Sequence, residues 1–281
     1  MHTYFDCIPC FFEQALRAGR MATDDEYKIK RLLDEVGMML KDIRPDDTPP
    51  ETGRRLYQRV KEITGNSDPF RKIKRKNTAK ALSLYPSLKG TVDASEDRLV
   101  AAIRLAIAGN VMDFGANKDF DIDAEINRVF KRKFAIFDCD EFRDHLDKTG
   151  EILYIADNAG ECVFDRLLME EMRKPVTYVV RGAPVINDAT YEDALQAGVH
   201  KMALIMSSGT DAPGTILATC SREFRQIYDR STFIISKGQG NYEALSGEKR
   251  PIFFLLKAKC RVIARDVGVN EGDIILKAIN T

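Results

Sequence analysis

Short apolar runs in the second half of the chain limit its fold more than any other feature of the sequence. They are rich in Val, Ile, Phe and Tyr, and helix-length stretches separate them. Near-continuous hydrophobicity, in place of alternation, indicates strands that are covered on both faces, as in a parallel sheet built from βαβ crossovers. The sequence therefore predicts an α/β fold with a doubly wound, mainly parallel α/β/α domain. The predicted strands are residues 152–156, 176–180, 201–206, 232–236 and 252–256.

The first 130 residues carry helical patterns instead. Thr23 to Glu26 has the spacing of a capping box, and apolar residues then recur every three or four positions as far as Ile43. Further helices are expected at about 51–64, 70–84 and 93–113. We therefore predict a helical domain, residues 1–130, and an α/β domain, residues 131–281, which pack tightly because no Gly/Ser linker separates them.

Composition excludes several classes of protein. The chain has 281 residues with 43 basic and 43 acidic side chains, so no net charge attracts nucleic acid or an acidic membrane. The basic run at residues 71–76 lacks interleaved aromatic residues and is expected to be a solvated helix face. The sequence shows no secretory signal and no apolar run of about 18 residues, which indicates a cytoplasmic protein without membrane contact. The six cysteines are too sparse for a disulfide framework.

Polar residues follow each predicted strand directly. Ligands of open parallel sheets bind outside the carboxyl ends of the strands, so these residues are expected to meet at one crevice. They include carboxylates and amides, Gly-rich turns that would let backbone N–H groups approach an anion, and lysines that would neutralise it. The segments are residues 157–161, 181–188, 207–214, 237–242 and 257–259.

Asp157, Asn158 and Asp188 are the candidate metal ligands, since Mg²⁺ and similar ions prefer oxygen ligands together with water and substrate phosphate. The alternative is that Asp157, Asn158 and Asp188 cap the helices that follow, as Asp and Asn often do. Convergence of five polar strand ends favours a site for an anion and a metal. Lys237 or Lys257 would then neutralise the charge on the phosphoryl group.

Six motifs in order along nearly the whole chain resemble the damage-control phosphatase family, formerly a domain of unknown function numbered eighty-nine. The early Cys-x-x-Cys is similar to the compact archaeal and bacterial branch. Eukaryotic members have Asp-Leu where this chain has Gln239-Gly240, so their sugar-phosphate preference is not carried over. The motifs are residues 7–10, 108–115, 156–161, 181–190, 236–242 and 253–260.

The resemblance implies a helical domain beside a Rossmann-like domain, and a metal-dependent phosphatase that hydrolyses phosphomonoesters of small metabolites such as sugar phosphates or related damaged compounds. It implies a divalent ion, Mn, Ni, Co or Mg, on Asp157, Asn158 and Asp188. By motif, substrate contacts fall on Gln239, Asn241 and Lys257. The same resemblance favours a site-lining role for Asn110 over a purely structural one.

Other residues leave alternatives open. Glu161 and Lys237 are expected to contact substrate because they follow predicted strands. Cys7 and Cys10 have metal or redox spacing, but no second Cys pair or close His pair completes a zinc site, so a buried pair fits equally well. None of the three histidines follows a predicted strand, which argues against histidine-based nucleophilic catalysis.

The predicted mechanism is hydrolysis in which a cation polarises a phosphoryl oxygen, with Asp157 and Lys257 as the catalytic residues. Water is the simplest nucleophile, although Asp157 or Glu161 could instead attack or act as the base. Two rival functions remain at this point. One is a carboxyl methyltransferase-like group transferase, and the other is a non-catalytic protein that binds a phosphometabolite or nucleotide.

Overall fold

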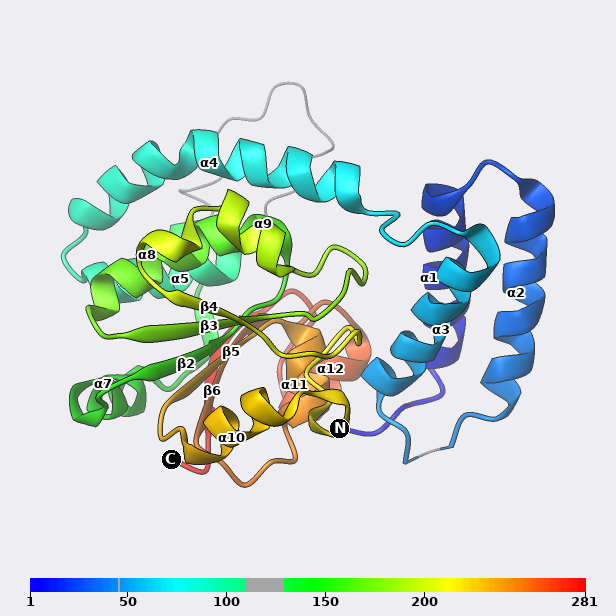
Figure 1. The fold of residues 1–281 in the computed structure, drawn as a ribbon. Coiled ribbons are helices and arrows are strands. Elements are labelled where there is room, and N and C mark those ends of the chain that lie inside the picture. The colour runs from blue at the N-terminus through cyan, green and yellow to red at the C-terminus, as the bar shows by residue number, and fades with distance from the viewer. Residues whose placement is uncertain (45, 110–128) are drawn as a thin grey trace.

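The computed structural model describes residues 1–44, 46–109 and 129–281. Its centre is a seven-stranded sheet in the order β1-β7-β6-β5-β2-β3-β4 (Figure 1). All neighbouring strands run parallel except β6 and β7, which are antiparallel. The strands are β1 (Phe134–Phe137), β2 (Ile152–Ile155), β3 (Val176–Val180), β4 (Leu204–Ser207), β5 (Ile234–Lys237), β6 (Ile252–Lys257) and β7 (Ile274–Ile279).

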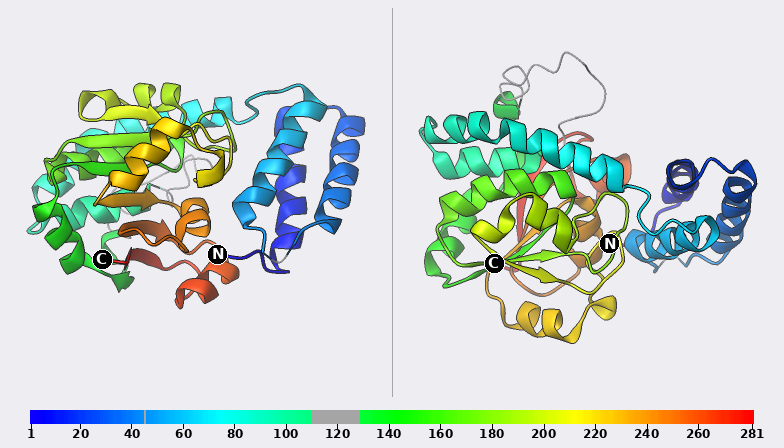
Figure 2. Two further views of the ribbon diagram at one scale, coloured as in Figure 1. Left: turned by 60° about the horizontal axis from the view of Figure 1, so that its bottom comes forward. Right: turned by 45° about the horizontal axis from the view of Figure 1, so that its top comes forward.

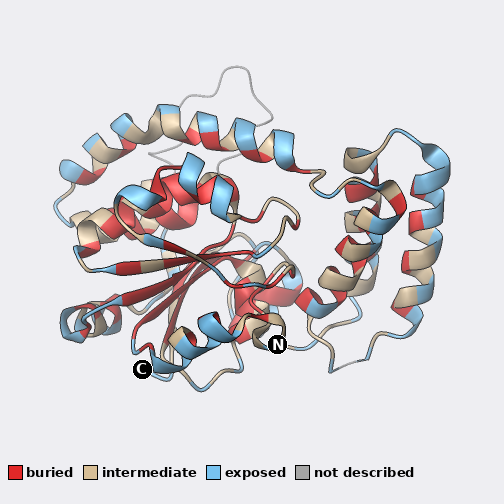
Figure 3. Cartoon of the chain, viewed as in Figure 1, coloured by how far each residue is buried: buried red, intermediate tan, exposed pale blue. Residues whose placement is uncertain are grey.

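The predicted fold class is confirmed, and each of the five predicted strands is present. Their continuous hydrophobicity has the expected cause, because every residue of β2 and β5 is buried (Figure 3). The predicted strand at 201–206 begins late, since Val199–Lys201 forms a short 3-10 turn before β4. Strands β1 and β7 were not predicted; β7 lies next to β6, and β1 lies beyond β7 at the edge of the sheet.

Helices cover both faces of the sheet (Figure 1). One face packs against a core that includes Phe142, Phe164 and Leu167. The other face packs against a core that includes Phe224, Tyr242 and Ile263. The first layer holds α4 (Arg71–Asp93), α5 (Arg98–Ala108), α7 (Cys139–Lys148), α8 (Cys162–Met172) and α9 (Tyr191–Gln196), and the second holds α10 (Arg222–Arg230), α11 (Gln239–Leu245) and α12 (Arg261–Val267).

The first three helices form a separate unit beside the sheet, seen from two further directions in Figure 2. They are α1 (Cys7–Ala22), α2 (Glu26–Lys41) and α3 (Pro49–Thr64), and they share their own core. The capping box predicted at Thr23 is wrong. The N-cap of α2 is Asp25, whose carboxylate accepts from the backbone N–H groups of Tyr27 and Lys28, while Thr23 follows α1.

Helices α4 and α5 belong to the core of the sheet, although they lie in the region that the sequence predicts as a helical domain. The predicted domain boundary at residue 130 stays a prediction. Within the basic run, Lys74 is buried and its Nζ lies 3.1 Å from Asp68 and 2.9 Å from Asp193, so this run is only partly a solvated face. No helix in the described part of the chain is long and apolar enough to cross a membrane.

Candidate active site

A cavity of about 920 Å³ lies between the three-helix unit and the carboxyl ends of the strands. This is the place where open α/β sheets bind their ligands. Its sheet side carries Asp157, Asn158, Glu161 and Asp188. Its helical side carries apolar and aromatic groups, among them Phe11, Pro50 and Tyr57, together with the cation of Arg17.

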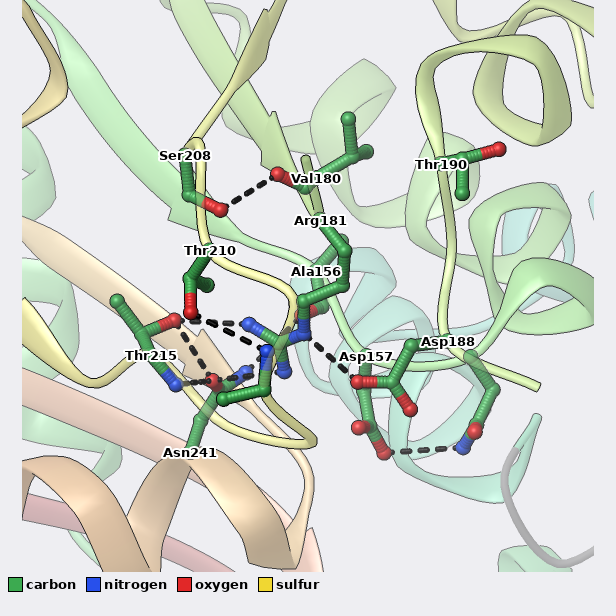
Figure 4. A network of polar contacts seen from close by, with 12 residues as sticks. Ala156, Asp157, Val180, Arg181, Asp188, Thr190, Ser208, Thr210, Thr215 and Asn241 are labelled. Atoms are coloured by element: carbon green, nitrogen blue, oxygen red, sulfur yellow. Dashed lines mark hydrogen bonds and ion pairs between the residues drawn. The ribbon is translucent and has the colours of Figure 1, made fainter. Parts of the chain in front are cut away.

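The three predicted metal ligands line the sheet side of this cavity. Figure 4 shows Asp157 close to Asp188. Asp157 and Asn158 follow β2, and Asp188 follows β3. The segments are joined by a β-bridge between Asn158 and Asp188 and by a 2.8 Å bond from Ala189 N to Asp157 O. The Asn158 amide donates to Asp157 Oδ2 at 2.9 Å and to Glu161 Oε1 at 2.5 Å. Pairing of β2 with β3 therefore gathers these side chains.

Neither Asn158 nor Asp188 caps the following helix with its side chain. Asn158 precedes the 3-10 turn η1 (Ala159–Glu161) but makes no capping bond with its side chain. The helix after Asp188 is α9, which is capped by Thr190 and Asp193 in a capping box.

Gly238 shapes the position of Asp157. Its φ is +80°, a conformation that side-chain-bearing residues rarely adopt, and a Cβ added there would lie 2.0 Å from Asp157 Oδ2. The carboxylate therefore rests directly against the backbone after β5. Only glycine at this position leaves room for it.

Other glycines of the loops at the strand ends lie very close to neighbouring backbone. A Cβ on Gly214 would lie 2.5 Å from Gly240 O, and a Cβ on Gly182 would lie 2.5 Å from Gly209 C. These four glycines let the loops pack against one another. Their close approach is to neighbouring backbone, so they support the site by packing.

Arg181 connects the carboxyl ends of three strands. Its guanidinium is buried and donates to Asp188 Oδ2 at 2.7 Å, to Thr215 Oγ1 at 2.9 Å and to Asn241 Oδ1 at 3.0 Å (Figure 4). The Asn241 amide in turn donates to the carbonyls of Ala156 and Lys237 at 3.0 and 2.8 Å. The network fixes one carboxylate oxygen of Asp188.

Asn241, predicted as a substrate contact, is fully buried in this network and does not line the described part of the cavity. Its amide is occupied by Arg181, by Thr215 and by two backbone carbonyls. A side chain that holds strand ends together cannot also bind a ligand without breaking those bonds. The structure places Asn241 in a supporting position.

Lys237, the other predicted substrate contact on β5, is also buried. Its ammonium donates to Glu161 Oε2 at 3.0 Å, to Asp165 Oδ1 at 2.7 Å and to Ala106 O at 2.8 Å. Since an ammonium has three N–H groups, all of them are used. The predicted contact between Lys237 and substrate does not fit this geometry, because the ammonium lies beneath the cavity and serves to neutralise buried carboxylates.

Replacing Lys237 by Met should destabilise the fold by about 3–5 kcal/mol, because it leaves Glu161 and Asp165 buried without their cation. Urea unfolding measures this difference. The matched control is Lys30→Met, which removes the exposed pair with Asp34 and should change stability by less than about 1 kcal/mol. Equal effects of the two substitutions would show that Lys237 has no structural role.

Burial raises the pKa of Glu161 to about 7; Lys237 opposes the shift, and the charge of Asp157 adds to it. Burial likewise raises the pKa of Asp188 to about 6, with Arg181 opposing and Asp157 adding. Three carboxyl groups thus crowd a poorly solvated site, and their mutual repulsion favours a cation among them. In the described residues no three His, Cys, Asp or Glu side chains are grouped as a metal site.

The remaining predicted contacts are placed as follows. Gln239 opens α11 and lines the cavity. Lys257 ends β6, is half-buried and is not among the described residues that line the cavity. It lies on the same sheet face as Phe253 and Leu255, which α5 covers. Asn110 lies outside the described residues.

The sequence reasoning missed four residues that shape the site: Asp165, Arg181, Gly238 and Lys259. Lys259 lines the cavity, and its backbone N–H donates to Gln239 Oε1 at 3.2 Å. Arg181 and Gly238 lie in segments that directly follow predicted strands, so their position in the chain could have indicated a role in the site. Asp165 lies inside α8, where nothing in the sequence distinguishes it from a surface carboxylate.

The fold and the cavity define a class of protein: a doubly wound α/β protein with polar side chains gathered at the carboxyl ends of parallel strands. Within that class the chain belongs to the damage-control phosphatase family. The model of the damage-control phosphatase ARMT1-like domain matches residues 3–275. This match confirms the resemblance drawn from the sequence motifs.

Relatives match over nearly their full length. A damage-control phosphatase of Archaeoglobus fulgidus is 36% identical, with 97% of this chain and 98% of the relative covered. A damage-control phosphatase of Pyrococcus horikoshii is 34% identical, with 98% and 97% covered. The crystal structure of a DUF89 family protein from Pyrococcus horikoshii has a TM-score of 0.91 at 34% identity and covers 99% of both chains.

Proposed function

We propose that this chain is a metal-dependent phosphatase that hydrolyses phosphomonoesters of small metabolites. One observation carries the proposal: Asp157, Asn158 and Asp188 converge at the sheet side of a ligand-sized cavity, with Asp157 seated against Gly238. The relatives named damage-control phosphatases support the reaction class, with damaged phosphometabolites as the substrate class.

The donor set fits a divalent cation such as Mn, Ni, Co or Mg. Two carboxylates and an amide oxygen supply hard ligands, and water and substrate phosphate complete the coordination of such ions. When bound, the cation supplies Lewis-acid polarisation of a phosphoryl oxygen. Arg181 contributes by donating to Asp188 Oδ2, which holds that carboxylate in place in the cavity wall.

Charge on the phosphoryl group requires cations from the protein as well. Lys257 is the last residue of β6, and Lys259 lies in the cavity wall two residues later. Glu161 lies beside Asn158 at the base of the site, and with a pKa of about 7 it suits proton transfer with a water nucleophile. We assign Lys257 to the phosphoryl group and Lys259 to the outer part of the substrate.

Replacing Lys257 by Ala should lower kcat about a hundredfold while the protein keeps its metal, because the lysine acts on charge in the transition state. Replacing Lys259 by Ala should mainly raise KM, since that side chain is exposed at the wall. Steady-state kinetics beside metal analysis separates the two variants. Wild-type kcat for the Lys257 variant would show that the phosphoryl group lies elsewhere.

Phosphate release from a panel of sugar phosphates and other phosphomonoesters tests the proposed function. The panel is run after chelation and again with Mn²⁺, Ni²⁺, Co²⁺ or Mg²⁺ added, and we expect release only with a metal. Methyl transfer to carboxyl groups without phosphate release would favour the group transferase. Saturable phosphometabolite binding with neither reaction would favour a binding protein.

A further inference from the structure

The turn that carries Asp188 contains a strained residue. Ile186 has a φ of +43°, in the left-handed region, where a β-branched residue is a genuine outlier. Among the described residues other than glycine, only Arg173 and Asn280 share that sign of φ. Arg173 ends α8, a place where chains commonly enter this region, and asparagine adopts it readily. Neither of them has the branched side chain that makes the conformation of Ile186 costly.

A backbone hydrogen bond closes this turn. Asp188 N donates to Val185 O at 3.1 Å, so Ile186 and Asn187 are the two central residues. Turns with a positive φ at the first central residue are dominated by Gly, Asn and Asp. An isoleucine persists there only where the surrounding structure holds it, since the strained backbone would otherwise relax.

Val185 anchors the turn to the three-helix unit. The loop after β3 extends from the sheet to this unit (Figure 1), and the Val185 side chain, 2% exposed, belongs to the core that the three helices share. Its partners in that core include Phe11, Leu32 and Leu56, one from each helix. Ile186 packs against the same core and also lines the cavity. Burial of these two apolar side chains stabilises the turn and offsets its strain.

The other end of the turn is fixed to the predicted metal ligands. Asn187 O accepts from Ala159 N at 2.9 Å, and Ala159 directly follows Asn158. Asp188 forms a β-bridge with Asn158 and accepts from Arg181 at 2.7 Å. Four residues of chain therefore connect the core of the three-helix unit to the donor set. A change of backbone conformation within them would move the carboxylate.

We propose that Val185 and Ile186 are positioning residues, through which the three-helix unit holds Asp188 in the metal site. Val185 is the anchor. The strain at Ile186 would move Asp188 away if that anchor were weakened. The effect on metal binding rests on the proposed function, whereas the strained turn and its anchor are present without a metal.

Two variants separate strain from packing. Val185→Ala weakens the anchor, so the turn should relax and chelator-treated protein should bind Mn²⁺ about tenfold more weakly by calorimetry. Adding Ile186→Gly removes the strain, because glycine adopts a positive φ readily, and should restore affinity to within about threefold of the wild type. Packing cannot account for such a rescue, since the second substitution removes further apolar atoms from the same core.

Val36→Ala is the matched control for the anchor. Val36 is buried in the same core, on α2, and is not part of the turn. The control should lower the melting temperature about as much as Val185→Ala does and leave the affinity for Mn²⁺ unchanged. Equal loss of affinity in the control would overturn the proposal, and so would a double variant that binds no better than Val185→Ala.

Hydrogen exchange in the metal-free protein gives a readout that does not depend on the phosphatase proposal. The Ala159 amide, which donates to Asn187 O, should exchange at least about tenfold faster in Val185→Ala and return toward the wild-type rate in the double variant. Unchanged exchange in Val185→Ala would show that Val185 does not hold the turn. A wild-type protein that shows this exchange pattern but binds none of Mn²⁺, Ni²⁺, Co²⁺ or Mg²⁺ would refute the proposed metal site alone.

Discussion

Replacing Asp157 by Asn is expected to lower kcat/KM at least about a thousandfold, or about 4 kcal/mol of transition-state stabilisation. The substitution keeps the size of the side chain and removes its charge, so the loss falls on metal binding and on the reaction. Metal content measured beside kinetics should decrease as well. Full activity in this variant would overturn the metallophosphatase proposal itself.

The same substitution should not destabilise the metal-free fold. The charge of Asp157 raises the pKa of both Glu161 and Asp188, so its removal relieves repulsion among three crowded carboxyl groups. We expect a melting temperature equal to or above that of the metal-free wild type. The control is Asp229→Asn, an exposed residue of α10 that should change neither activity nor metal content. A lower melting temperature for the Asp157 variant would mean that the lost activity reflects misfolding.

Replacing Gly238 by Ala is expected to lower kcat/KM by more than about a hundredfold and to destabilise the fold by about 1–3 kcal/mol. The new methyl group would overlap Asp157 Oδ2, and the left-handed backbone at φ +80° is strained for alanine. Because a misplacement of about 1 Å can by itself reduce turnover a hundredfold, the displaced carboxylate accounts for the kinetic effect. Kinetics and urea unfolding measure the two losses separately.

Gly247→Ala is the matched control for this variant. Gly247 lies in the turn after α11, its φ is not left-handed, and nothing lies within 4 Å of an added Cβ. Stability should change by less than about 0.5 kcal/mol and activity should be unaffected. A Gly238 variant that behaves like this control would show that Asp157 does not need its present position.

Local sequence determined the sheet, because strands that are buried on both faces must be apolar throughout. That requirement made β2, β3, β5 and β6 visible as short runs. Strand β1 stayed hidden because it lies at the edge of the sheet and alternates between half-buried and exposed residues. Strand β7 pairs antiparallel with β6 although α12 lies between them in the chain, whereas the predicted βαβ crossovers lead to parallel neighbours.

The sequence could also place Asp157, Asn158 and Asp188 near one another. Parallel strands bring their carboxyl ends to the same edge, so a polar residue directly after a buried strand has a predictable position. The sequence could not show which residues pair with the lysine and arginine side chains in the same segments. Whether Lys237 faces the cavity or Asp165 depends on how α5 and α8 pack against the sheet.

The sequence by itself thus determined the fold class, the burial of the strands on both faces and the gathering of Asp157, Asn158 and Asp188 at their carboxyl ends. All of these follow from burial patterns and from residues adjacent in the chain. Only the tertiary structure decided the rest: the burial of Lys237 and Asn241, the contact of Asp157 with Gly238, and the helical wall of the cavity. These contacts join segments far apart in sequence, and their geometry arises when helices and loops pack, which no local pattern encodes.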